Sequence, residues 1–330
     1  MVNRLRFYVR SHACIAVLAA ILATMGLASA ASASQGAHGA RHAGYQRGRI
    51  HHVLGKGGPA SGHPGIGHGP GHGPGSSRQS SYLALGDSLA FGYSAAKFKE
   101  LEPEENPADY NTGYVDDFAH LLKLGNPKLE VVNDGCPGET TESFIKGPCE
   151  YQLAYRLHHP YVGGPTSSQL SDALTYLQAN PNTNPITLDI GANDALGVIE
   201  HTCEKKVECV IKEAPALFAH IAANLGLILT DLRGADPHAT IIVLGLYNPF
   251  GEKLPGGNAL TAQLNEVMEK VASTVGARFA DPLPIFNPPG ALEEPTICLL
   301  TNMCKTPEDI HPTDLGYGVL AGLIAKEYYF

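Results

Sequence analysis

From residue 82 onward, short apolar runs alternate with longer stretches of helical periodicity. The runs have the length of single strands and stand at Tyr82–Leu85, Leu129–Val132, Ile186–Ile190, Thr240–Leu246 and Ala277–Ala280. Between them, apolar residues recur at the spacing of amphipathic helices over 170–177, 217–232 and 260–275. Gly234 and Gly276 are expected to end the second and third of these helices. Five strands that alternate with helices predict an α/β fold, a three-layer α/β/α sandwich with a central five-stranded parallel sheet.

Polar residues follow three of the predicted strands, where a parallel sheet binds its ligands. Gly86-Asp87-Ser88 comes after the first strand, Asn133–Thr140 after the second and Gly191–Asp194 after the third. Ser88 would open a helix, whose positive end favours a developing negative charge nearby. Taken singly, each segment is also an ordinary helix cap or turn, so only their combination indicates chemistry.

A histidine precedes the last helical pattern. His311 stands in Glu308-Asp309-Ile310-His311-Pro312, with acids two and three residues before it. A lone histidine is usually a surface or packing residue. A neighbouring carboxylate, however, is what orients an imidazole as a general base.

Four blocks in this order resemble the SGNH hydrolases, also called the GDSL esterase/lipase family. They are GDSLAFGYS at 86–94, NDGCPGET at 133–140, GAND at 191–194 and EDIHPTDLGY at 308–317. The resemblance covers 81–330 and implies a flavodoxin-like arrangement of the sheet. It also implies a serine ester hydrolase that forms an acyl-serine intermediate and needs no metal or other cofactor, acting on a small-molecule or lipid ester.

Residue by residue, the resemblance implies Ser88 as the nucleophile and His311 as the general base. The oxyanion hole would consist of the N–H groups of Ser88 and Gly135 and the amide of Asn193. The family places its acid three residues before the histidine, where this chain has Glu308; Asp309 has the usual residue type, but its side chain is expected to point elsewhere. The motif position favours Glu308, although both acids, or a backbone carbonyl in their place, remain candidates.

Other functions compete with this interpretation. Acids near strand ends could serve a metal-dependent phosphoesterase, and they are Asp87, Asp134, Asp189 and Asp194. A carbohydrate acetylesterase would share the fold, and a non-catalytic secreted binding protein would lack the serine, asparagine or histidine that this chain retains. Segments 98–112 and 144–166 are expected to shape the substrate pocket. Their neighbourhood supplies candidate groove residues, for most of which ordinary packing is the stronger interpretation: Tyr110, Tyr114, Tyr151, Tyr155 and Tyr161.

The N-terminus has the pattern of an export signal. Three arginines precede the apolar run 14–28, and small residues follow at 28–33. The run is shorter than the roughly 20 residues of a spanning helix, which favours a signal peptide over 1–33, cleaved near residues 30–33, above an uncleaved anchor. Segment 34–80 is rich in Gly, His and Pro and predicts a disordered linker, with the hydrolase domain over 81–330. We therefore expect a secreted protein.

Charge and cysteine content refine this picture. The hydrolase domain holds 15 Lys and Arg against 32 Asp and Glu, which excludes nucleic acid as a partner. The linker carries five basic residues and seven histidines, which leaves open a weak cell-surface contact or loose metal binding. Six cysteines lie beyond the signal, and in an oxidising compartment their spacing favours three local disulfides among the pairs Cys136/Cys149, Cys203/Cys209 and Cys298/Cys304.

Overall fold

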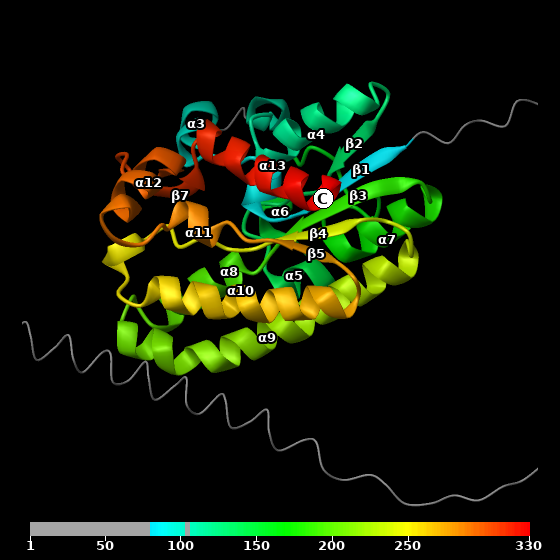
Figure 1. Ribbon diagram of the computed structural model, residues 1–330. Coiled ribbons are helices and arrows are strands. Elements are labelled where there is room, and N and C mark those ends of the chain that lie inside the picture. Colours follow the sequence, from blue (N-terminus) through cyan, green and yellow to red (C-terminus); the bar gives the residue numbers. More distant parts are fainter. Residues whose placement is uncertain (1–79, 103–105) are drawn as a thin grey trace, which may run out of the picture. The chain divides into compact units, whose positions relative to one another are not determined.

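The computed structural model describes residues 80–102 and 106–330. The predicted signal peptide and all but the last residue of the predicted linker therefore lie outside the described residues. The described part contains a parallel sheet in the order β2-β1-β3-β4-β5 (Figure 1). Its strands are β1 Ser81–Gly86, β2 Glu130–Asn133, β3 Thr183–Asp189, β4 Ile241–Leu244 and β5 Arg278–Ala280. The predicted five-stranded α/β fold is confirmed.

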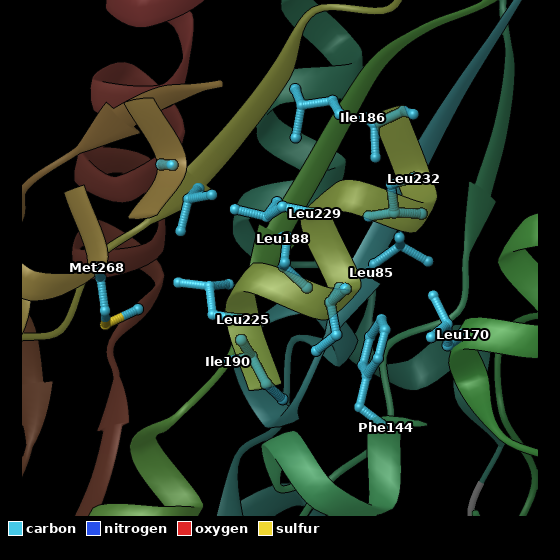
Figure 2. Close-up of a cluster of buried hydrophobic side chains, with 14 of the residues drawn as sticks. Leu85, Phe144, Leu170, Ile186, Leu188, Ile190, Leu225, Leu229, Leu232 and Met268 are labelled. Atoms are coloured by element: carbon cyan, nitrogen blue, oxygen red, sulfur yellow. The ribbon is translucent and has the colours of Figure 1, made fainter. Parts of the chain in front are cut away.

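The strands alternate their side chains between two apolar cores. Leu83 and Leu85 of β1 face one core, and Tyr82 and Ala84 face the other. The first core is covered by α5 Thr141–Lys146, α7 Gln169–Ala179, α9 Val207–Ala235 and α10 Gly257–Thr274 (Figures 1 and 2). The second is covered mainly by α4 Tyr114–Gly125 and α13 Asp314–Tyr329. Both faces of the sheet are buried, which explains the nearly continuous apolar runs.

The three predicted helical stripes lie in α7, α9 and α10. The second helix does not end at Gly234, because α9 continues to Ala235 and is capped at Asp236. Gly276 does follow the end of α10, with a φ of 65°. Among the described residues, α9 has the length and apolar composition of a membrane span. Its leucines at 225, 229 and 232 are fully buried against the sheet (Figure 2), so core packing accounts for that composition.

A two-stranded ribbon and several short helices complete the domain. A two-stranded antiparallel ribbon of β6 Thr301–Asn302 and β7 Asp309–Pro312 was not predicted, because its polar, two- and four-residue strands have no apolar pattern. The short helices are α2 Ser88–Phe91, α3 Ala95–Leu101, η1 Pro107–Tyr110, α6 Glu150–Ala154, α8 Ala192–Leu196, η2 Gly197–Thr202, η3 Gly251–Lys253, α11 Leu283–Phe286, η4 Gly290–Leu292 and α12 Glu293–Leu300.

Three disulfides join the cysteine pairs that the spacing favoured. Cys136–Cys149 ties the loop after β2 to the start of α6, and Cys203–Cys209 closes the turn into α9. Cys298–Cys304 joins α12 to the connection between β6 and β7. Each bridge closes a short loop, so its main effect is local stiffening of a segment near the rim of the sheet.

Candidate active site

Ser88 is held at the carboxyl end of β1 by a glycine turn and a helix cap. Gly86 has a φ of 141°, and a Cβ there would lie 2.3 Å from the carbonyl oxygen of Asp189. The side chain of Gln169 accepts the Gly86 N–H at 2.6 Å and donates to its carbonyl at 2.9 Å. Asp87 caps α2 by accepting the Leu89 N–H at 3.0 Å, which makes Ser88 the first residue of the helix. The serine is therefore fixed from both sides.

The imidazole of His311 lies between Ser88 and Asp309. Its Nε2 is 3.0 Å from Ser88 Oγ, and its Nδ1 is 2.5 Å from Asp309 Oδ1. Asp309 also accepts the His311 backbone N–H at 3.1 Å and the Ala95 N–H at 2.9 Å. Burial raises the pKa of Asp309, but the hydrogen bonds and the charge of His311 outweigh burial and leave that pKa below its usual value. The Tyr93 ring packs on the imidazole with a centroid distance of 4.8 Å.

Glu308 does not take part in this arrangement, so the preference that its motif position gave it is wrong. Its side chain is 60% exposed and forms an ion pair with Lys253 at 2.6 Å. The physical reason is the extended backbone of β7. In a strand, residues two apart point to the same face, so Asp309 and His311 share a side. The expectation that the side chain of Asp309 points elsewhere is wrong for the same reason.

Gly135 is not placed to donate to an oxyanion, which corrects a second prediction. Its N–H is bonded to Asn133 Oδ1 at 3.0 Å, and a Cβ there would lie 2.6 Å from the Phe91 nitrogen. Gly135 is thus a packing glycine beneath α2. Gly138 is exposed, has a φ of 83° and lines a pocket together with Ser88. Among the described residues, no acceptor receives the N–H of Gly138 or of Ser88. The Pro137-Gly138 turn signal could have identified this donor from the sequence.

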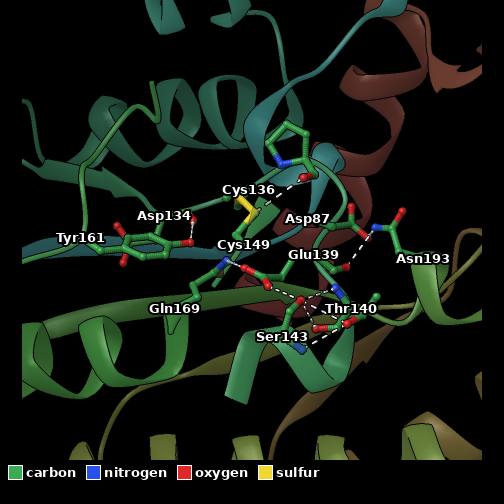
Figure 3. Close-up of a disulfide and its surroundings, with 12 residues drawn as sticks. Asp87, Asp134, Cys136, Glu139, Thr140, Ser143, Cys149, Tyr161, Gln169 and Asn193 are labelled. Atoms are coloured by element: carbon green, nitrogen blue, oxygen red, sulfur yellow. Dashed lines mark hydrogen bonds between the residues drawn. A yellow bond between two sulfur atoms is a disulfide. The ribbon is translucent and has the colours of Figure 1, made fainter. Parts of the chain in front are cut away.

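Asn193 is the third predicted donor, and it opens onto the same pocket. It stands near the start of α8, after Gly191, whose φ is 102°. Its amide nitrogen donates to the Glu139 carbonyl at 2.9 Å and to Asp87 Oδ2 at 3.3 Å (Figure 3). Burial raises the pKa of Glu139 to about 7. The hydrogen bond to the Glu139 backbone carbonyl fixes the orientation of the Asn193 side chain beside Ser88.

The acids of the metal hypothesis have hydrogen-bond donors within the part of the chain that the structure describes, and only Oδ2 of Asp134 is left without one. Asp189 accepts the backbone N–H groups of Asp87 and Ala90 at 3.0 and 3.3 Å and the Tyr114 hydroxyl. Burial and the adjacent Asp189 carboxylate raise the pKa of Asp87 well above its ordinary value. Burial likewise raises the pKa of Asp189, the other member of this buried pair. Asp194 accepts both the N–H and the hydroxyl of Thr141.

Two pockets meet at Ser88, Asn193 and His311. One is lined mainly by apolar side chains from η2, α9, α10 and the segment after β4, including Ile199, Val210, Leu217, Phe218, Phe250 and Leu260. The other is lined by aromatic, polar and proline side chains, including Tyr93, Phe98, Pro148, Glu150 and Tyr151. Segments 98–112 and 144–166 thus contribute to the second pocket. Of the five tyrosines considered above, only Tyr151 lines a described pocket, and Tyr110, Tyr114 and Tyr161 are buried.

Sequence reasoning missed the apolar pocket. Its signal was the segment Leu246–Phe250, which is apolar except for Asn248 and continues past the end of β4, beyond the sheet core. A strand that runs into further apolar residues at the ligand-binding edge of a parallel sheet is a pointer to such a pocket.

A serine after β1 and an imidazole and a carboxylate from β7 stand in line beside this parallel α/β/α sheet, an arrangement that fits a hydrolase. The sequence model of the GDSL-like lipase/acylhydrolase family matches residues 84–319, and the chain belongs to this family. This confirms the resemblance seen in the four sequence blocks.

Several solved structures share the fold. A mutant of an acetyl-xylooligosaccharide esterase from Geobacillus stearothermophilus is 18% identical in sequence and has a TM-score of 0.50. The match covers 77% of this chain and 96% of the esterase chain. An extracellular lipase from Streptomyces rimosus is 18% identical, with a TM-score of 0.50 and coverages of 75% and 99%. A lipase from a goat rumen metagenome is 19% identical, with a TM-score of 0.50 and coverages of 76% and 98%. No curated protein matches the chain.

Proposed function

We propose that this protein is a secreted serine esterase of lipase type, which hydrolyses carboxylic esters through an acyl-Ser88 intermediate. The observation that carries the proposal is the contact of Ser88 Oγ with His311 Nε2 at 3.0 Å, together with the 2.5 Å contact of His311 Nδ1 with Asp309. An unaided serine hydroxyl is a weak nucleophile, and an oriented imidazole is the group that activates it.

In the proposed mechanism, His311 Nε2 takes the Ser88 proton while Oγ attacks the ester carbonyl carbon. Asp309 holds the Nδ1–H and stabilises the imidazolium that forms. The N–H groups of Ser88 and Gly138 donate to the oxyanion. The Asn193 amide joins them by giving up its long 3.3 Å hydrogen bond to Asp87 Oδ2. When the tetrahedral intermediate collapses, the imidazolium gives its proton to the leaving alkoxide. Water then attacks the acyl-enzyme by the same proton route and releases the acid.

The two pockets favour a particular division of the substrate. The apolar pocket beside Ser88 suits an acyl chain, because burying each methylene there contributes about 0.8 kcal/mol. The second pocket, with its mixed aromatic and polar lining, suits the alcohol part. We therefore infer that acyl groups longer than acetyl are preferred, which ranks a lipase-type esterase above a carbohydrate acetylesterase.

Secretion and domain organisation belong to the same proposal. Three disulfides fit a protein that matures in an oxidising compartment. The sequence supports a signal peptide over 1–33 and a linker over 34–80 ahead of a hydrolase domain over 81–330. In this arrangement the basic linker tethers the domain and allows a weak cell-surface contact.

The serine mechanism is tested by Ser88→Ala in the purified protein, with p-nitrophenyl butyrate as the substrate. We expect kcat to fall about 10⁴-fold or more while the thermal unfolding temperature stays unchanged. Ser94→Ala is the matched control, since the Ser94 hydroxyl makes no capping hydrogen bond at the start of α3. A Ser88→Ala protein that keeps the wild-type rate would overturn the proposed acyl-Ser88 intermediate.

The substrate proposal has its own experiment, a series of p-nitrophenyl esters from acetyl to lauroyl, with acetylated xylan and a phospholipid alongside. We expect kcat/KM to rise from acetyl to a longer acyl group. An optimum at acetyl, with release of acetate from xylan, would overturn the lipase-type assignment and leave the serine mechanism intact.

A further inference from the structure

Three side chains form a second charged cluster away from Ser88. Asp134 stands in the loop after β2, His159 in the connection between α6 and α7, and Asp172 on α7. His159 Nδ1 lies 2.7 Å from Asp134 Oδ1 and 3.8 Å from Asp172 Oδ2. One ligand atom from each of the three residues lies within 4.8 Å of the others. The cluster thus brings two carboxylates and an imidazole together from three separate segments.

The charges of this cluster are not balanced. Asp134 is 0% and Asp172 is 2% exposed, yet Oδ2 of each accepts no hydrogen bond. Their other oxygens are occupied, by His159 and by the Val162 N–H at 2.5 Å. In the described part of the chain, neither carboxylate pairs with a lysine or an arginine. A protonated His159 offers one positive charge against two buried negative charges, and a buried charge without a partner is costly.

We propose that Asp134, His159 and Asp172 bind a divalent transition-metal ion, Zn²⁺, and that water completes its coordination. Imidazole nitrogen and carboxylate oxygen are ligands of Zn²⁺ at about 2.0–2.2 Å. Ca²⁺ and Mg²⁺ prefer all-oxygen sites, so the nitrogen donor argues against them. On binding, His159 Nδ1 releases its proton to solvent and uses the freed lone pair, while the orphaned oxygens gain a cation.

The proposed ion would act on structure rather than on the ester. It would tie the connection between α6 and α7 to the loop after β2, where Cys136 forms its disulfide and the Tyr161 hydroxyl already donates to the Asp134 carbonyl at 2.9 Å (Figure 3). The neighbouring group of Cys136, Glu139 and Cys149 is no alternative site, since its sulfurs are joined to each other.

The test is Zn²⁺ binding by the full chain after removal of metal with EDTA, followed by isothermal titration calorimetry with ZnCl2. We expect Asp172→Asn to lose one binding site relative to the wild type. That variant keeps an acceptor for the Val162 N–H, so its fold is preserved. The seven histidines of 34–80 are present in both proteins and contribute equally. His220→Gln is the matched control, because His220 is exposed and 3.9 Å from Asp194, and it should keep the site.

Two further measurements keep the proposal falsifiable. Zn²⁺ should raise the unfolding temperature of the wild type and of His220→Gln, and not that of Asp172→Asn. Anomalous scattering at the zinc edge from a soaked crystal should give a peak about 2.0–2.2 Å from His159 Nδ1. Equal Zn²⁺ stoichiometry in the wild type and Asp172→Asn would overturn the proposal, as would a zinc peak confined to other residues. A response to Ca²⁺ with none to Zn²⁺ would overturn the choice of ion.

Discussion

Two aspartate–histidine pairs in this domain share one local chemistry and differ in their surroundings. His311 Nδ1 meets Asp309 Oδ1 at 2.5 Å, and His159 Nδ1 meets Asp134 Oδ1 at 2.7 Å. In the first pair, the remaining ring nitrogen faces Ser88 and the remaining carboxylate oxygen accepts the Ala95 N–H. In the second, the remaining oxygen of Asp134 has no hydrogen-bond donor, and a second carboxylate stands nearby.

The pKa shifts of the two acids have opposite signs. Burial raises the pKa of Asp134 to about 6, in spite of its hydrogen bond from His159. Burial acts on Asp309 as well, but there the donors around the carboxylate outweigh it and lower the pKa. The contact between imidazole and carboxylate therefore does not define a catalytic pair. The partners of the remaining atoms differ, and the two proposals above rest on this difference: proton transfer for the first pair and cation binding for the second.

Removing each imidazole gives the largest expected difference between the pairs. His311→Asn should lower kcat/KM for p-nitrophenyl butyrate by about 10³–10⁵-fold, because Ser88 loses its general base. His159→Gln should keep activity within about threefold in the absence of added zinc, since no atom of His159 lines either pocket. Comparable losses in the two variants would contradict the division of roles. Circular dichroism and thermal unfolding serve as folding controls.

The acids beside His311 give the next largest effect. Asp309→Asn should lower kcat by about 10²–10⁴-fold, because an amide can no longer stabilise the imidazolium and can favour the wrong tautomer. Glu308→Gln should stay within about twofold, since its exposed carboxylate reaches only Lys253. Wild-type rates in both variants would mean that a backbone carbonyl orients His311.

The contrast between these two acids shows how far the sequence could lead. The sheet and its helices were predictable because two buried faces impose long apolar patterns on β1, β3 and β4 and on the helices beside them. The ribbon that aligns Asp309 with His311 has polar strands of two and four residues and no such pattern. Its register depends on pairing with β6, which is a tertiary interaction and leaves no local signal.

The same distinction holds for the oxyanion donors. Ser88 and Asn193 follow directly from strand ends, whose positions the apolar runs fix. The choice between Gly135 and Gly138 depends on which backbone N–H remains free after the loop folds over α2, and spacing alone does not reveal this. The second aspartate–histidine pair was out of reach for the same reason, because Asp134, His159 and Asp172 meet only after α7 packs beside β1.

The two glycines in the loop after β2 allow a smaller test. This loop runs from Asp134 of the second pair to the active site. Gly138→Ala should lower kcat by about 10–100-fold, because a side chain at φ 83° is strained and shifts the donor. Its Cβ meets open space, so the loss of stability should be limited to the backbone strain of about 1–2 kcal/mol. Gly135→Ala should instead lower the unfolding temperature, because its Cβ would meet the Phe91 nitrogen at 2.6 Å. A catalytic defect at full stability in Gly135→Ala would restore that residue as the donor.

The smallest expected effect is the contribution of ionised Asp309 to the free energy of unfolding, which depends on pH. The pKa of Asp309 in the folded protein lies below its ordinary value of 3.8, so the unfolded chain takes up a proton first as the pH falls. The stability that the ionised carboxylate contributes is therefore complete above about pH 4–5 and is lost as the pH drops through the folded-state pKa. Urea unfolding at pH 6 and pH 3 should show a larger loss of unfolding free energy in the wild type than in Asp309→Asn. Equal losses in the two proteins would mean that His311 and Ala95 do not stabilise the ionised carboxylate.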